Sequence, residues 1–133
     1  MSVGKSILLL FGLLVLALVI LVFVRASTDS TRISVEDVRS KIERELPKGT
    51  PADAIILWLE EENEYDLQSQ GLAHRYSRLQ DRGVPPGTGV IFASIWDTGR
   101  DGLFTTKLID IWFLLGEQNE LTDTIVSESG VGL

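Results

Sequence analysis

The sequence predicts an α+β protein in which an N-terminal transmembrane helix precedes a helical hairpin packed on a three-stranded antiparallel β-meander. Three observations predict this class: an uncharged apolar run near the N-terminus, two short amphipathic patterns joined by a Pro-Lys-Gly turn, and β-forming segments separated by turns in the last third. We therefore divide the chain into an N-terminal tail at residues 1–6, a transmembrane helix (signal-anchor) at 7–24, a polar tether at 25–33 and a soluble α+β domain at 34–133.

The apolar run is long enough to cross a membrane. Ile7–Val24 is uncharged and lies between Lys5 and Arg25. As a helix it measures about 27 Å, close to the hydrocarbon thickness of about 30 Å. We expect a single-pass anchor in the lipid bilayer. A cleaved signal peptide is the alternative, because Val24 and Ala26 suit a signal peptidase site, but the run exceeds the usual signal core of about 7–15 residues.

The orientation of this helix has signals in both directions. A short tail ahead of a long apolar run is typical of a signal-anchor that exports the domain on its C-terminal side, so we expect a periplasmic domain at the cell membrane. Arg25, Arg32 and Arg39 favour the opposite orientation under the positive-inside rule. The chain has no cysteine, which excludes attachment through a lipidated cysteine and a disulfide framework.

The rest of the chain is strongly acidic. Residues 1–25 contain two of the twelve basic residues and none of the nineteen acidic ones, so the remainder carries a formal charge of −9. Such a surface repels nucleic acid and anionic lipid headgroups. We therefore expect no nucleic-acid partner.

Two helices are predicted at the start of the domain. The first begins with a capping box, Ser34 to Asp37, and ends near Leu46. Pro47-Lys48-Gly49 stops it, and a second helix begins with Thr50 as N-cap and Pro51 at the first helical position. The apolar spacing within each helix predicts one buried face, formed by Val35, Val38, Ile42 and Leu46 in the first and by Ala52, Ile55, Ile56 and Leu59 in the second.

A stripe of arginines lies in the middle of the chain. If residues 71–83 are helical, Leu72, Tyr76 and Leu79 share one face and three arginines share another. The arginines are either a docking site for an acidic partner or a lipid phosphate, or a solvated face that pairs with nearby glutamates. They are Arg75, Arg78 and Arg82.

Three strands are predicted at residues 90–96, 104–115 and 121–126, with Asp97–Gly102 as a loop. Along the middle strand, Ile109, Ile111 and Phe113 face one side, and Leu108, Asp110 and Trp112 face the other. Trp96 and Trp112 would share that second face if the strand register allows it. They would then bind a protein partner there, unless residues 64–84 cover them.

Signals for catalysis and metal binding are weak. Asp97-Thr98-Gly99 is similar to the aspartic-protease signature, but that mechanism needs two carboxylates, which one copy supplies only through a symmetric dimer. His74 is the single histidine, so zinc ligation and histidine-assisted nucleophilic catalysis have almost nothing to build on. We expect no catalytic residue, metal or cofactor.

The order helix, turn, helix and three-stranded meander resembles the small outer-membrane-lipoprotein component of the β-barrel assembly machinery, and the β-lactamase-inhibitor proteins that share its fold. The matching residues are Leu46-Pro47-Lys48-Gly49-Thr50-Pro51-Ala52-Asp53-Ala54-Ile55, and Ile111-Trp112-Phe113 through Gly116 to Leu121, within residues 34–127. The lipidated cysteine of that family is absent. The resemblance implies a non-enzymatic role in protein–protein contact.

Together these features predict a membrane-tethered, non-enzymatic protein-interaction module of the bacterial cell envelope. A small-ligand-binding sensor or enzyme accessory domain is the alternative, and a dimeric protease at Asp97 is a third. The candidate partner-binding residues are Trp96, Trp112, Arg75, Arg78 and Arg82.

Overall fold

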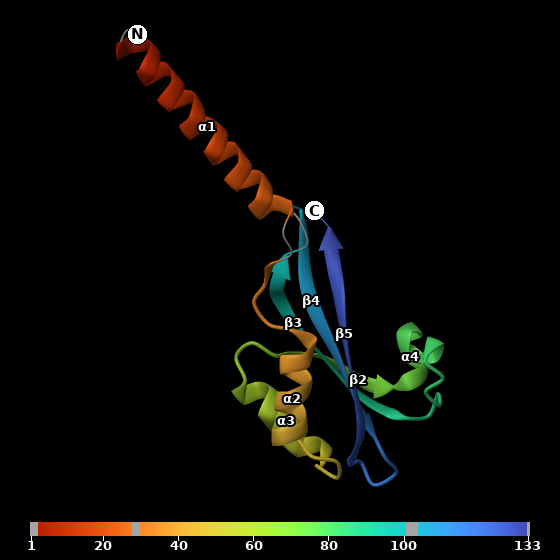
Figure 1. The fold of residues 1–133 in the computed structure, drawn as a ribbon. Helices are drawn as coiled ribbons and strands as arrows, with labels where there is room; N and C mark the ends of the chain where they lie inside the picture. Colours follow the sequence, from red (N-terminus) through yellow and green to blue (C-terminus); the bar gives the residue numbers. More distant parts are fainter. Residues whose placement is uncertain (1–2, 28–29, 101–103, 133) are drawn as a thin grey trace.

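The molecule has two parts, an exposed helix α1 (Val3–Ser27) and an α+β domain from whose end it projects (Figure 1). The structure is a computed structural model that describes residues 3–27, 30–100 and 104–132. Within those ranges, α1 is the one helix long and apolar enough to cross a membrane; Val3–Phe23 has a mean hydropathy of 3.2, and none of it is buried. Such a helix is a membrane anchor or a signal sequence.

The strands described in the domain form an antiparallel sheet. Its long strands have the order β2 (Asp66–Leu72), β3 (Gly89–Arg100), β4 (Thr105–Leu115) and β5 (Leu121–Gly132). A two-residue strand, β1 (Ser30–Thr31), pairs with the far end of β3. The predicted meander is β3–β4–β5, with all three strands present.

The prediction of three strands is wrong, because β2 adds a fourth long strand at the edge of β3. The sequence of β2, DLQSQGL, lacks the alternation of apolar and polar residues that marks a half-buried strand. Nearly all of its side chains are exposed, so both polar and apolar residues are tolerated along the strand. The strand is held by pairing with β3, which local sequence does not report.

β3 also continues through most of the predicted Asp97–Gly102 loop, as far as Arg100. The register shifts between Ile95 and Gly99, where Trp96, Asp97 and Thr98 lie opposite Leu108 alone. Asp97 has a φ of 55°, in the left-handed region that short polar side chains tolerate. The loop prediction is therefore wrong at residues 97–100, because these residues belong to β3 and the extra ones form a β-bulge. Asp101 and Gly102 lie outside the described residues.

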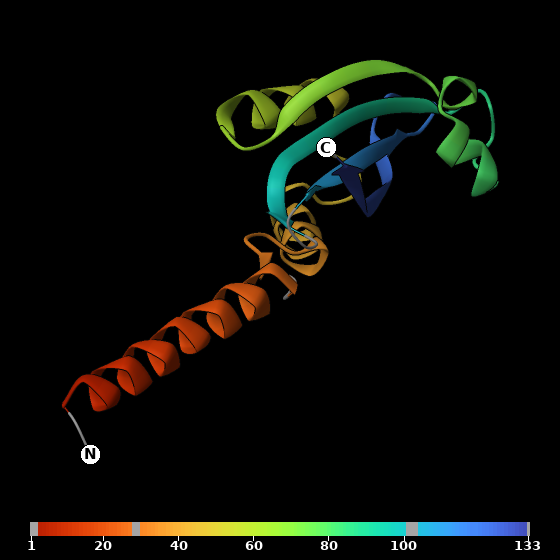
Figure 2. The same cartoon turned by 90° about the horizontal axis from the view of Figure 1, so that it is seen from above.

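Helices α2 (Val35–Glu45) and α3 (Ala52–Glu61) cover one face of the sheet (Figures 1 and 2). The predicted capping box of α2 is confirmed: the Asp37 backbone N–H donates to the Ser34 hydroxyl at 3.1 Å, and the Ser34 N–H donates to the Asp37 carboxylate at 3.4 Å. The predicted Thr50 cap of α3 is wrong, because Pro51 occupies the N-cap. The Thr50 hydroxyl instead donates to the Pro47 carbonyl at 2.6 Å and closes the turn.

The sheet separates two apolar cores. The larger lies between the sheet and the two helices, and it contains Ile109, Ile111 and Phe113 of β4. The smaller lies on the opposite face, beneath the 3-10 helix η1 (Ala73–Arg75) and the short helix α4 (Ser77–Asp81). The predicted alternation along β4 is thus confirmed. Within the predicted helical segment at residues 71–83, Ala73–Arg75 and Ser77–Asp81 are helical, whereas Gly71 and Leu72 belong to β2. The smaller core comprises Ala73, Leu79, Val90, Trp112 and Leu114.

Candidate functional site

The two tryptophans predicted to share a partner-binding face have different surroundings. Trp112 is 4 % exposed, because η1 and α4 cover it, and its ring stacks on Phe92 with centroids 5.2 Å apart. Tyr76 continues this aromatic row at 5.8 Å from Phe92. Trp96 lies in the β3 bulge and is 51 % exposed. Trp112 is thus covered by part of residues 64–84, which was the alternative to an exposed partner-binding face.

The face of the sheet beneath α4 holds a carboxylate, that of Asp110, which accepts hydrogen bonds from three side chains. The Ser94 hydroxyl donates to Oδ1 at 2.9 Å, while the Arg78 guanidinium and the Ser129 hydroxyl donate to Oδ2 at 3.1 and 3.3 Å. Asp110 is 7 % exposed and lies within an apolar strand. Arg78 of α4 thus pairs with a carboxylate of β4 on the face of the sheet that α4 covers, and not with the nearby glutamates.

The three predicted arginines are not brought together as one site. Arg75 and Arg78 line a shallow groove of about 260 Å³ above Phe92 and Trp112. Arg82 is exposed, caps the C-terminus of α4 and lies outside the groove. The groove is built on a floor of aromatic rings with the Arg78–Asp110 pair at its side.

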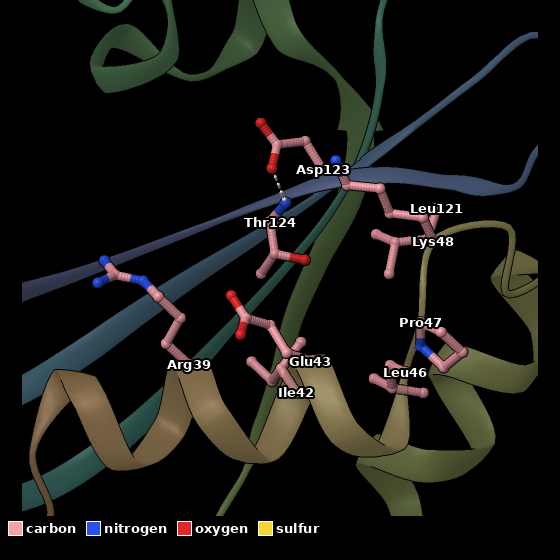
Figure 3. Close-up of a pocket in the computed structure, with 9 residues that line it drawn as sticks. All are labelled: Arg39, Ile42, Glu43, Leu46, Pro47, Lys48, Leu121, Asp123 and Thr124. Atoms are coloured by element: carbon pink, nitrogen blue, oxygen red, sulfur yellow. Dashed lines mark hydrogen bonds between the residues drawn. The ribbon is translucent and has the colours of Figure 1, made fainter.

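A second groove, which we call the α2–β5 groove, was not predicted from the sequence. It has a volume of about 250 Å³ and lies between α2 and the first residues of β5. Its floor is apolar and its rim carries charges of both signs, with Arg39 and Glu43 on α2 facing Thr124 on β5, while the Asp123 side chain points away from α2 (Figure 3). The remaining lining residues are Ile42, Leu46, Pro47, Lys48 and Leu121.

The outer edge of β5 borders this groove. β5 is the last strand of the sheet, and in the part of the chain that the structure describes only its start is covered: Leu121 exchanges backbone hydrogen bonds with Gly49 and Thr50 at 2.7 and 2.8 Å. Further along, the Thr124 N–H donates to the Asp123 carboxylate at 2.8 Å. The register with β4 shifts at Thr122, between the pairs Leu115–Leu121 and Leu114–Asp123, so the alternation that begins at Leu121 is offset by one residue beyond this point. From Thr124 onward successive residues alternate in direction, and the backbone groups of Val126 and Glu128 share the outward direction of Thr124. Such a row of outward N–H and C=O groups is a template for another strand.

A cluster at the far end of α3 joins the two helices. Lys41 donates to Glu62 at 2.7 Å and lies above the rings of Trp58 and Tyr65, which meet edge to face at 4.9 Å. Burial raises the pKa of Tyr65 to about 12, with a further contribution from the charges of Glu62, Glu64 and Glu45. These contacts hold the helical hairpin together.

The remaining chemical candidates lie apart from both grooves. Asp97 is exposed in the bulge, and its carbonyl oxygen accepts a hydrogen bond from Arg32 at 3.2 Å. His74 Nδ1 lies 3.3 Å from the Pro86 carbonyl oxygen. Within the described ranges, no group of three histidine, cysteine or acidic side chains is placed to hold a metal ion.

Comparison with known proteins gives no relative from which a role could be transferred. No protein-family model matches the chain, and neither a curated protein nor a solved structure shows significant similarity to it. The class of the molecule is therefore defined by its own features, an exposed apolar helix joined to a small α+β domain whose surface carries grooves.

Proposed function

We propose that this chain is a membrane-anchored, non-enzymatic module of the bacterial cell envelope that binds an extended segment of another protein. The observation that carries the proposal is the position of the α2–β5 groove directly beside the uncovered edge of β5. A peptide that adds to a sheet edge gains affinity from main-chain hydrogen bonds and specificity from pockets that take alternate side chains. The β5 edge and the groove supply these two parts.

The lining of the groove indicates the chemistry of the bound segment. The apolar floor, formed by Ile42, Leu46 and Leu121, suits an aliphatic or aromatic side chain. The charges of both signs at the rim suit polar residues on either side of that anchor. Because the domain carries an excess of acidic residues, a neutral or basic segment would approach it faster than an acidic one.

The anchor in this proposal is α1, uncleaved, with the domain on the periplasmic side. Its apolar side chains are exposed along Val3–Phe23, where lipid would cover them. Protease treatment of intact spheroplasts tests the orientation, because an exported domain is digested whereas a cytoplasmic one is protected. The N-terminal sequence of the membrane-bound protein tests whether α1 is retained, since cleavage after Ala26 would remove it.

Site-specific photo-crosslinking in native membranes tests the binding surface. A photoreactive amino acid replaces Thr124 beside the groove, and the matched control replaces the exposed Gln80 on α4. We expect Thr124 to capture a discrete protein, crosslinked through one short segment, and Gln80 to capture none. Equal capture at the two positions, or capture at Gln80 alone, would contradict the proposal. Absence of protein capture at Thr124 would favour the small-ligand alternative.

A further inference from the structure

Exposed apolar side chains gather at the end of the sheet that lies nearest to α1. Phe104 is 68 %, Trp96 51 % and Val131 48 % exposed. Val131 pairs with Thr106 at the start of β4, Phe104 directly precedes that strand, and Trp96 lies in the nearby bulge of β3. We call these three residues the sheet-end cluster. Among the described residues outside α1, the other large apolar residues that are exposed, Leu57, Leu67 and Leu72, lie on α3 and β2.

The covalent chain holds this end of the sheet close to α1. α1 ends at Ser27, and β1 begins at Ser30 and pairs with Gly99 and Arg100 of β3. Three Cα–Cα steps of about 3.8 Å each separate Ser27 from Ser30, so they lie within about 11 Å of one another. In Figure 1 the ends of β3, β4 and β5 accordingly lie beside the end of α1.

Hydrogen bonds also restrict how the domain is oriented relative to this connection. The backbone N–H groups of Arg32 and Ile33 donate to the Thr98 carbonyl at 2.6 and 3.1 Å. The Arg32 side chain donates to the Asp97 carbonyl and forms an ion pair with Glu64 at 2.7 Å. The segment that leaves the membrane helix is thus fastened to the bulge that exposes Trp96.

We propose that the sheet-end cluster docks into the interfacial layer of the same bilayer that α1 enters. This inference rests on the proposed membrane anchor but not on the proposed peptide groove. Tryptophan and tyrosine concentrate at the membrane–water interface, where their amphipathic rings lie at the level of the headgroups. Trp96 is such a residue, and Phe104 and Val131 add apolar surface that gains from leaving water. The short connection to α1 brings the cluster to that depth without any change in the fold.

The attraction is apolar, because the acidic domain gains nothing from anionic headgroups. Docking therefore persists in zwitterionic lipid and at high salt. It also sets the position of the α2–β5 groove: Asp123 beside the groove and Val131 in the cluster are eight residues apart on β5. At about 3.4 Å per residue, the groove would lie up to about 27 Å from the docked end.

Fluorescence quenching by lipid tests the docking. The full chain is reconstituted in phosphatidylcholine vesicles that contain a lipid with a nitroxide near the headgroup. Trp58 and Trp112 are 9 % and 4 % exposed, so the quenching that Trp96→Phe removes reports Trp96 alone. We expect the double variant Phe104→Ser, Val131→Ser to lose roughly half of that quenching or more, since two apolar anchors are removed. The matched control Leu57→Ser, exposed on α3, retains all of it.

Three results would overturn the inference. Quenching that is the same in the wild type and in Trp96→Phe would place Trp96 in water. Quenching that is unchanged in the double variant would show that proximity to α1, and not docking, brings Trp96 near lipid. Protection of Trp96 that rises with the ratio of protein to lipid would assign the cluster to a second copy. Flotation of the vesicles separates these results from failure of the anchor: a chain that does not float with lipid lacks a membrane anchor altogether.

Discussion

Asp110 shows how single residues stabilise the face of the sheet that α4 covers. Its carboxylate is nearly buried, yet three donors from β3, β5 and α4 satisfy it. The aromatic row of Tyr76, Phe92 and Trp112 packs beside it. The cluster therefore has a structural explanation, in which Arg78 is a charged partner of the carboxylate.

Loss of the Asp110 carboxylate should cost more stability than loss of its arginine partner. In Asp110→Ala the buried Ser94 hydroxyl loses its acceptor, which costs about 1–3 kcal/mol in the free energy of unfolding. Arg78 has a side chain that is 54 % exposed, so Arg78→Ala costs about 1 kcal/mol or less. Chemical denaturation in detergent micelles measures both, and an equal or larger loss in Arg78→Ala would contradict this explanation.

Tyr65 should make the stability of the domain depend on pH in the alkaline range. Its pKa is raised from 10.0 to about 12 in the folded state, so the folded protein holds the phenol proton more tightly than the unfolded one. The resulting stabilisation is complete below pH 10 and is lost as the pH rises through about 12. Denaturation midpoints between these values should fall more steeply for the wild type than for Tyr65→Phe. Parallel curves would rule out the raised pKa.

At the scale of elements, the sequence predicts those features whose causes are local. The capping box of α2 and the alternation of β4 depend on residues a few positions apart, and both are confirmed. β2 depends on pairing with β3, and the covering of Trp112 depends on Leu79 and Ala73 packing on it. Those contacts leave little periodicity in the sequence.

The candidate site was predictable only in part, for the same reason. Trp96 and Trp112 have the alternation expected of one face, but a bulge in β3 and the helix above Trp112 separate their environments. The α2–β5 groove combines residues about eighty positions apart, such as Arg39 and Asp123. No local sequence pattern therefore predicts the groove. Asp110, a carboxylate within an apolar stretch of β4, is a local signal of the cluster beneath α4.

The N-cap of α2 should contribute measurably to the stability of the helical hairpin. Ser34→Ala removes the acceptor for the Asp37 N–H and should cost about 1 kcal/mol. Ser40→Ala is the matched control, because Ser40 is exposed within the same helix, where alanine is the better helix former. We expect thermal unfolding to shift downward for the first variant only. A shift of the same size in both would leave the cap without a role.

A substitution at the outer edge of β5 should weaken binding of the partner without lowering the stability of the sheet. The Thr124 N–H donates to the Asp123 carboxylate and is not used by β4, so Thr124→Pro removes no ladder hydrogen bond. We expect this variant to unfold near the wild-type midpoint but to lose capture of the partner by a crosslinker at Glu43, across the groove. Undiminished capture would mean that the partner does not add to the β5 edge.

At the scale of the whole molecule, the two ends of the sheet have different surroundings. One end is joined to α1 through β1 and carries the sheet-end cluster, and the other end forms the α2–β5 groove. With α1 in the bilayer and the cluster at its surface, the groove faces away from the membrane. The proposed binding of a protein segment therefore needs no movement of the domain.

Residue-resolved amide hydrogen exchange along β5, with and without the captured partner segment, tests the central claim most directly. If the segment pairs with the β5 edge, the outward N–H groups of Val126 and Glu128 become protected, because they gain hydrogen-bond acceptors. Those of Ile125 and Ser127, which point toward β4, change little. Protection confined to α4, or a uniform change along β5 without this alternation, would contradict the account.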